Sequence, residues 1–279
     1  MSASQQKPSA IPGLEPILVS APFGNYIRPQ GATATLGTFT AEARGGRIRQ
    51  ILRTVRYYPR LKAWVNRIGL RNPGMPWLVK KVEAGKVDVS KAVVSIHGFD
   101  EADWDALLEQ TKQIRPLAVE LNMSCPNVGE IGCPEGLFDK AVATGVPVIV
   151  KLPPVNYQGL YRQAIQAGAR SFHCCNTLPV PAGGLSGAPL QPLSLACIRW
   201  IREQEGGAEL TLVGGGGIRA VADIDRYAEA GADHVALGTK TMNPVLLVTH
   251  GPIRPLIEYA HQRLGAGGGS PQMNTDLHG

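Results

Sequence analysis

Residues 209–241 read ELTLVGGGGIRAVADIDRYAEAGADHVALGTKT and carry the pattern that decides the fold. An apolar run that ends in glycines (209–217) is followed by a helix-like stretch (220–232) and then by a second apolar run (233–241). Strands that alternate with helices indicate parallel βαβ units. The stretch therefore predicts one strand–helix–strand unit of a parallel sheet.

The same alternation runs through the rest of the chain. Six more apolar or β-branched runs precede this unit, at 16–24, 32–39, 91–98, 116–124, 146–154 and 170–177. Eight strands in one domain of this length predict a closed (β/α)8 TIM barrel rather than an open sheet. We expect residues 1–264 to form that single domain and the Gly/Ser-rich end, 265–279, to be disordered.

The composition is globular, with 44% hydrophobic and 18% charged residues in a chain of 279. No apolar run is long enough to cross a bilayer, and the N-terminal MSASQQKPSA has no hydrophobic signal core. The five cysteines show no CxxC spacing, which favours reduced thiols over a disulfide framework. We expect a cytoplasmic protein with neither a membrane anchor nor a metal site.

The net charge of +6 is unevenly spread, because residues 43–82 contain eleven basic side chains and no acidic one. A block of one sign attracts phosphates, carboxylates or nucleic acid. A solvated basic face, or part of a subunit contact, is the simpler interpretation.

Polar and glycine residues gather where the predicted strands end. In a barrel these ends share one rim, where binding sites are built. The turns VGGGGIR (213–219) and LGTKT (237–241) end the last two strands, and such turns let backbone N–H groups approach a phosphate. Lys151 of VIVKLPP could stabilise negative charge, for instance on a reduced flavin, although a lysine that reaches solvent past the rim is the alternative.

The stretch LNMSCPNV (121–128) places two amides, a hydroxyl and a thiol behind a buried-looking strand, where packing alone predicts Val or Ile. This concentration of polar side chains at the end of a strand favours a chemical role over a packing role. Together with VKLPP, NT, GGLSG, GGGGI and LGT, this block resembles the dihydroorotate dehydrogenase family, most closely its soluble class 1 branch. The resemblance runs from about Thr35 to Met242.

The resemblance implies FMN across the top of the barrel and oxidation of dihydroorotate to orotate in pyrimidine biosynthesis. A loop cysteine, here Cys125, would remove the C5 proton while the C6 hydride passes to flavin N5. The resemblance also implies that two copies of the chain form a homodimer. The electron acceptor in the family is fumarate, a partner NAD-linked subunit or quinone, and the missing N-terminal membrane helix argues against quinone.

Further site residues are carried over from matching motifs; NRIGLRN (66–72), for example, resembles the family's NSxGLxN. The substrate residues so implied are Asn66, Ile68, Gly69, Leu70, Asn122, Asn127, Asn176 and Thr177. The FMN residues so implied are Lys151, beside the N1/O2 edge of the flavin, and Gly187, Gly216, Gly217, Gly238 and Thr239, around the ribityl phosphate.

One position departs from the family. TLGTFTAEAR (35–44) resembles TKSxTxxPR but has Gly37 where a lysine contacts flavin and substrate. Arg44 or Arg67 is the candidate replacement, and a close dihydropyrimidine analogue is the alternative substrate.

Two other functions stay open. NMSCP is close to the NxGCP motif of tRNA-dihydrouridine synthases, and the basic block could bind RNA. Asn127, and the lack of a helical RNA-binding domain after residue 260, make nucleic acid the less favoured partner. A flavin-binding barrel without turnover is the third possibility.

Overall fold

Eight parallel strands close into a barrel in the computed structural model, which describes residues 11–123 and 133–265. Around the barrel they are β1 (Ile17–Val19), β2 (Thr33–Phe39), β5 (Ala92–Ile96), β6 (Ala118–Asn122), β7 (Val148–Leu152), β8 (Ser171–Cys174), β11 (Thr211–Gly215) and β12 (His234–Leu237). The barrel closes at β1, where Leu18 pairs with Thr33 of β2 and with Ala236 of β12. The predicted (β/α)8 barrel is confirmed, and each of the eight predicted runs contains one of its strands.

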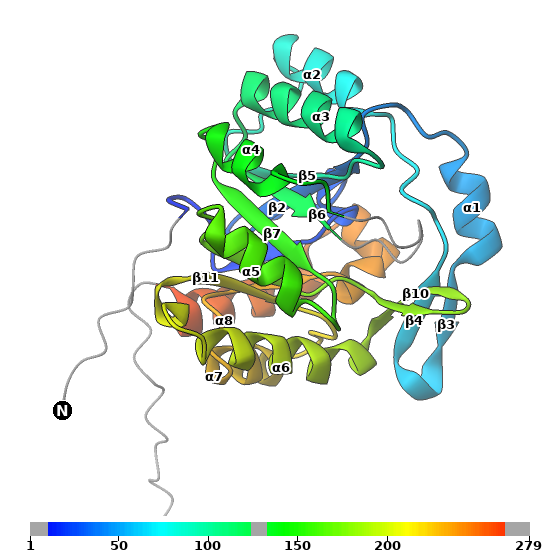
Figure 1. Ribbon diagram of the computed structural model, residues 1–279. Coiled ribbons are helices and arrows are strands. Elements are labelled where there is room, and N and C mark those ends of the chain that lie inside the picture. The colour runs from blue at the N-terminus through cyan, green and yellow to red at the C-terminus, as the bar shows by residue number, and fades with distance from the viewer. Residues whose placement is uncertain (1–10, 124–132, 266–279) are drawn as a thin grey trace, which may run out of the picture.

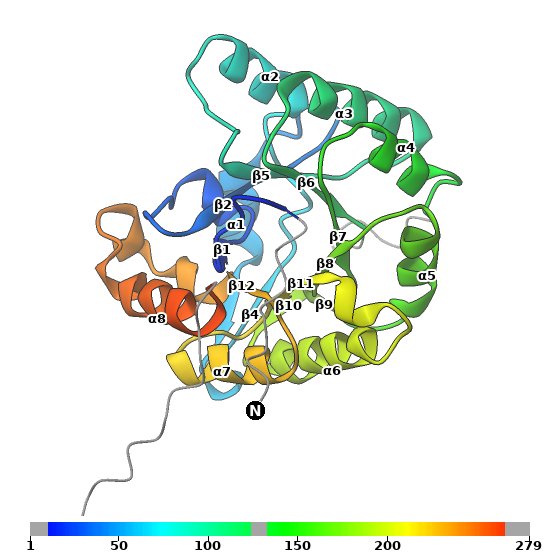
Figure 2. The same ribbon diagram turned by 90° about the vertical axis from the view of Figure 1, so that its left-hand side faces the viewer.

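Helices cover the outside of the barrel (Figure 1, Figure 2). They are α2 (Met75–Glu83), α3 (Glu101–Ile114), α4 (Leu137–Ala143), α5 (Gln158–Gln166), α6 (Gln191–Arg202), α7 (Val221–Glu229) and α8 (Arg254–Leu264). Each is amphipathic; α3, for instance, buries Trp104, Leu107 and Leu108 on one face. Its N-cap residue Asp100 accepts a hydrogen bond from the backbone N–H of Asp103. Among the described helices, none has the length and apolar character that crossing a bilayer requires.

Side chains alternate along each strand between the helix layer and the barrel interior. The interior far from the rim is apolar and contains Ile11, Leu14, Leu18, Val93, Ala118, Ile149, Val213 and Ala236. One inward position further along β6, β7 and β8, the buried side chains are Glu120, Lys151 and His173. Packing thus seals one end of the barrel and leaves charged groups beneath the C-terminal rim.

A second, antiparallel sheet and α1 (Arg47–Thr54) stand beside the barrel end (Figure 1). The sheet has the order β3 (Arg56–Tyr58), β4 (Ala63–Asn66), β10 (Gly183–Gly187) and β9 (Leu178–Val180). The sequence did not predict this part. The basic segment supplies α1, β3 and β4, and neither α1 nor β3 has a buried residue, which agrees with the solvated basic face that the sequence favours.

Candidate active site

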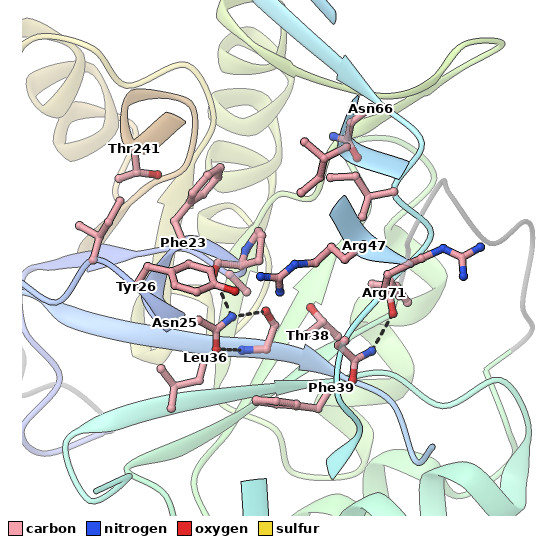
Figure 3. A pocket seen from close by; sticks show the side chains of 18 of the residues that line it. Phe23, Asn25, Tyr26, Leu36, Thr38, Phe39, Arg47, Asn66, Arg71 and Thr241 are labelled. Atoms are coloured by element: carbon pink, nitrogen blue, oxygen red, sulfur yellow. Dashed lines mark hydrogen bonds between the residues drawn. The ribbon is translucent and has the colours of Figure 1, made fainter. Parts of the chain in front are cut away.

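A cavity of about 770 Å³ lies at the C-terminal rim of the barrel. Its walls come from the 3-10 turn Phe23–Asn25, the end of β2, α1, the loop after β4 and α2, and most of their side chains are apolar (Figure 3). The polar side chains at the barrel end are Thr38, Asn122, Lys151, Asn176 and Thr177. A volume of this size accommodates a flat cofactor ring together with a small substrate.

The structure brings most of the predicted substrate residues to this cavity. Asn66, Ile68, Leu70, Asn122, Asn176 and Thr177 all line it, as does Lys151. Gly69 lies between two lining residues, in a turn with a φ of 72°. Cys125 and Asn127 fall outside the described residues, so their predicted roles stay predictions.

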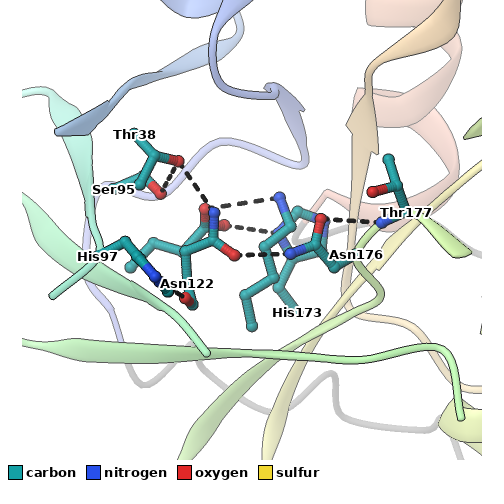
Figure 4. A network of polar contacts seen from close by, with 9 residues as sticks. Thr38, Ser95, His97, Asn122, His173, Asn176 and Thr177 are labelled. Atoms are coloured by element: carbon teal, nitrogen blue, oxygen red, sulfur yellow. Dashed lines mark hydrogen bonds and ion pairs between the residues drawn. The ribbon is translucent and has the colours of Figure 1, made fainter. Parts of the chain in front are cut away.

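Hydrogen bonds fix the orientation of the two amides at the barrel end (Figure 4). Asn122 Nδ2 donates to Thr38 Oγ1 at 3.1 Å, and Asn176 Nδ2 donates to Asn122 Oδ1 at 2.6 Å. Thr177 N donates to Asn176 Oδ1 at 2.8 Å, and His97 Nδ1 donates to the Asn122 carbonyl at 2.7 Å. Amides held in this way can bind a flat ring with fixed donors and acceptors at little entropic cost.

A buried charge cluster lies directly beneath the amides. Lys151 Nζ is 3.6 Å from Glu120 Oε1, and His173 Nδ1 is 2.6 Å from Glu120 Oε2. Burial raises the pKa of Glu120, but the attraction of Lys151 and the hydrogen bonds from His173 and Ser95 outweigh it and lower the pKa to about 2. Burial, and then the nearby Lys151 ammonium, lower the pKa of His173, so a neutral imidazole donates to the carboxylate.

Sequence reasoning missed this cluster, although a signal was present. Glu120 is a carboxylate inside an apolar run, two residues before Asn122, and the two-residue period of a strand puts both on the inward face. The carboxylate forms an ion pair with the ammonium of Lys151, which is only 8% exposed and lines the cavity.

The predicted phosphate residues gather at neighbouring strand ends. Gly216 and Gly217 follow β11, and Gly238 and Thr239 follow the adjacent β12. Gly187 approaches from β10 so closely that a Cβ at Gly217 would lie 2.9 Å from its carbonyl oxygen. None of these five residues lines the cavity, so their predicted contact with a phosphate stays a prediction. The cavity volume and the buried ammonium fit a flat cofactor at the rim.

No side chain fits at Gly37, where the family has lysine. Its φ is 104°, and a Cβ there would lie 2.4 Å from the Ser95 carbonyl oxygen. Asn25 fixes the same backbone, since Asn25 Nδ2 donates to Gly37 O at 3.0 Å and Gly37 N donates to Asn25 Oδ1 at 3.1 Å. This backbone therefore excludes the family's lysine.

The two arginines predicted to replace that lysine do not line the cavity. The Arg44 guanidinium lies 4.5 Å from the centre of the Phe99 ring, and Arg67 Nη2 donates to Pro181 O at 2.5 Å. The structure instead places Arg47 of α1 in the cavity wall. The lining of the cavity therefore gives no support to Arg44 or Arg67, and their replacement of the lysine stays a prediction. The prediction lacked the helix that turns Arg47 inward.

Gly37→Ala is expected to lower the free energy of unfolding by about 2–5 kcal/mol, since the positive φ costs about 1–2 kcal/mol and the overlap with backbone about 1–3 kcal/mol. Urea unfolding measures the change. Gly45→Ala is the matched control, because a Cβ at Gly45 meets nothing within 4 Å. Equal stability of the two variants would contradict the steric argument.

A parallel barrel with rigid amides, a buried lysine and glycine turns at one rim is typical of barrel enzymes, which build their active sites at that rim. The family model described as dihydroorotate dehydrogenase matches residues 25–250. The catalytic subunit of dihydroorotate dehydrogenase B (NAD(+)) of Latilactobacillus sakei is 30% identical over 82% of this chain and 85% of its own length. Dihydroorotate dehydrogenase A (fumarate) of Limosilactobacillus reuteri is 30% identical over 66% of this chain and 68% of its own length.

The fold also matches a solved structure, the dihydroorotate dehydrogenase of Eimeria tenella in complex with ferulenol. The TM-score is 0.66 at 17% identity, over 94% of this chain and 85% of that one. The chain belongs to the dihydroorotate dehydrogenase family, whose members are flavin-dependent. The comparisons do not favour a tRNA-dihydrouridine synthase.

Proposed function

We propose that this chain oxidises dihydroorotate to orotate with FMN, as a step of pyrimidine biosynthesis. The observation that carries the proposal is the convergence of Asn66, Asn122, Asn176 and Lys151 on one cavity at the barrel rim, in a chain of this family. We propose that residues 1–264 form the single domain that does so.

The residues have separate roles in this reaction. Asn66, Asn122 and Asn176 hold the pyrimidine ring through its fixed donors and acceptors. Cys125 Sγ accepts the C5 proton. FMN, when bound, supplies the acceptor for the C6 hydride. Lys151 would hold the bound flavin and stabilise negative charge on it, and the apolar walls exclude water from the reacting atoms.

Partner and location belong to the same proposal. The name of the Latilactobacillus sakei relative contains the words catalytic subunit and NAD(+), which supports an electron-transfer partner subunit, whereas the other relative's name gives fumarate as the acceptor. We propose a homodimer in the cytoplasm. The location is supported by the unbridged thiols of Cys133, Cys174, Cys175 and Cys197.

Anaerobic titration of the FMN-loaded protein with dihydroorotate tests the reaction. Dihydroorotate is expected to bleach the absorbance of oxidised FMN in a stoichiometric titration. Dihydrouracil, which lacks the carboxylate, serves as the comparison ligand. Bleaching by dihydrouracil alone would show that the substrate is wrong, and FMN that stays oxidised with both would leave a flavin-binding barrel without this activity.

A further inference from the structure

One wall of the cavity carries the positive charge of an arginine. Arg47 is the first residue of α1 and lines the cavity. Its guanidinium carbon lies 5.2 Å from the centre of the Tyr26 ring, and Figure 3 shows it extending across the cavity toward that ring. In the part of the chain that the structure describes, no carboxylate forms an ion pair with Arg47. A guanidinium in apolar surroundings favours an anionic ligand.

The other cations that line the cavity are held by protein groups. Lys151 pairs with Glu120. Arg28 Nε donates to the Gly24 carbonyl at 3.1 Å, and Arg71 Nη1 donates to the Gly45 carbonyl at 2.6 Å. The Nε of Arg71 is buried and has no hydrogen-bond partner among the described residues, but the guanidinium itself is anchored through Nη1. Within the described residues, Arg47 is therefore the lining cation that has neither an ion pair nor a hydrogen bond to a protein group.

The fold holds Arg47 on the inner side of α1. Gln50 Nε2 donates to Arg67 O at 2.9 Å, and Arg67 N donates to Thr54 Oγ1 at 3.1 Å, which ties the helix to the chain that follows β4. Ile51 lines the cavity on the same side as Arg47. Ile48, the next residue of the helix, is turned away from the cavity and is 75% exposed. The orientation of α1 thus directs the Arg47 side chain into the cavity.

We propose that Arg47 binds the carboxylate of the substrate, in place of the lysine that Gly37 excludes, and makes the site select anionic dihydropyrimidines over neutral ones. The inference rests on the proposed function and adds the residue that sets its substrate class. A guanidinium suits the role, because its paired N–H donors match the two oxygens of a carboxylate. Stacking on Tyr26 keeps the guanidinium plane in place.

Orotate and uracil form a matched pair of probes, because uracil has the same ring without the carboxylate. The dissociation constants of both are measured on FMN-loaded protein, from the change in FMN absorbance and by calorimetry. Arg47→Met is expected to raise the constant for orotate by roughly 10- to 100-fold, the loss of one charged hydrogen-bonded contact, and to leave that for uracil unchanged. Arg47→Lys should retain most of the orotate affinity.

Arg49→Met is the control, because Arg49 is an exposed arginine on the same helix and does not line the cavity. It should leave both constants at their wild-type values. Equal orotate binding by Arg47→Met and wild type, or an equal loss for orotate and uracil, would overturn the inference and leave the proposed function in place. A wild-type protein that holds FMN but binds no orotate would overturn both.

Discussion

Replacing Cys125 with alanine is expected to slow the reduction of bound FMN by dihydroorotate by about 10²–10⁴-fold, which is the usual contribution of a general base. FMN binding should not change, because the predicted FMN contacts lie on other segments. In the wild type the rate should rise with pH toward ~8.5, since the thiolate is the base and an ordinary thiol is only a few per cent ionised at neutral pH. Anaerobic stopped-flow absorbance measures both effects.

The cysteines that the structure describes are poor substitutes for this base. Burial raises the pKa of Cys133 to about 11. A hydrogen bond with Cys197 and burial raise the pKa of Cys174, and burial raises that of Cys175. Cys197 is a fully buried residue of α6. Protonated or enclosed thiols accept no proton from a ligand at the rim.

Cys133→Ala is the matched control for this prediction. Its thiol is half-buried and donates to the carbonyl of Pro134, so removing it should leave the rate of flavin reduction unchanged. A Cys125→Ala variant that reduces its flavin at the wild-type rate would remove Cys125 from the mechanism. A comparable loss in Cys133→Ala would point to an unspecific effect of losing a thiol.

The barrel was predictable from sequence because its strands are buried on both faces. Each is a short apolar run followed by glycine or polar residues, which is typical of parallel strands. The same reasoning located the lining residues Asn122, Lys151 and Asn176, since the C-terminal ends of all the strands meet at one rim.

The second sheet was not predictable in the same way. β3 and β4 have three and four residues, too few for a periodic pattern. The pairing of β4 with β10 joins Ala63 to Gly187, so tertiary contacts set it. The position of the cavity arginine depends on this part of the fold. Arg47 points from α1 into the cavity, whereas Arg49 is exposed on the same helix. Counting the basic residues of the segment does not distinguish the two.

Glu120→Gln is expected to lower the free energy of unfolding at pH 7 by about 3–5 kcal/mol, the usual cost of breaking a buried ion pair by removing one partner. The glutamine keeps the size of the side chain but leaves the buried Lys151 ammonium, and the hydrogen bond from His173, without a negative charge. Urea unfolding of the two proteins measures the difference. Glu101→Gln is the control, because the Glu101–Lys140 pair is exposed and solvent screens it, so the unfolding midpoint should hardly move.

The difference in unfolding free energy between wild type and Glu120→Gln should depend on pH, whereas a packing defect would give the same difference at every pH. The pKa of Glu120 is about 2 in the folded protein and 4.5 ordinarily, so the unfolded chain takes up the proton first as pH falls. The stabilisation by Glu120 is therefore complete above pH 4.5 and disappears as pH falls toward 2. The lowered pKa of His173 has the same sign, because protonation below its ordinary value of 6.5 favours the unfolded chain. The stability gap between wild type and Glu120→Gln should thus narrow from pH 5 to pH 3, and a gap that stays constant would show that Glu120 acts through packing rather than through its charge.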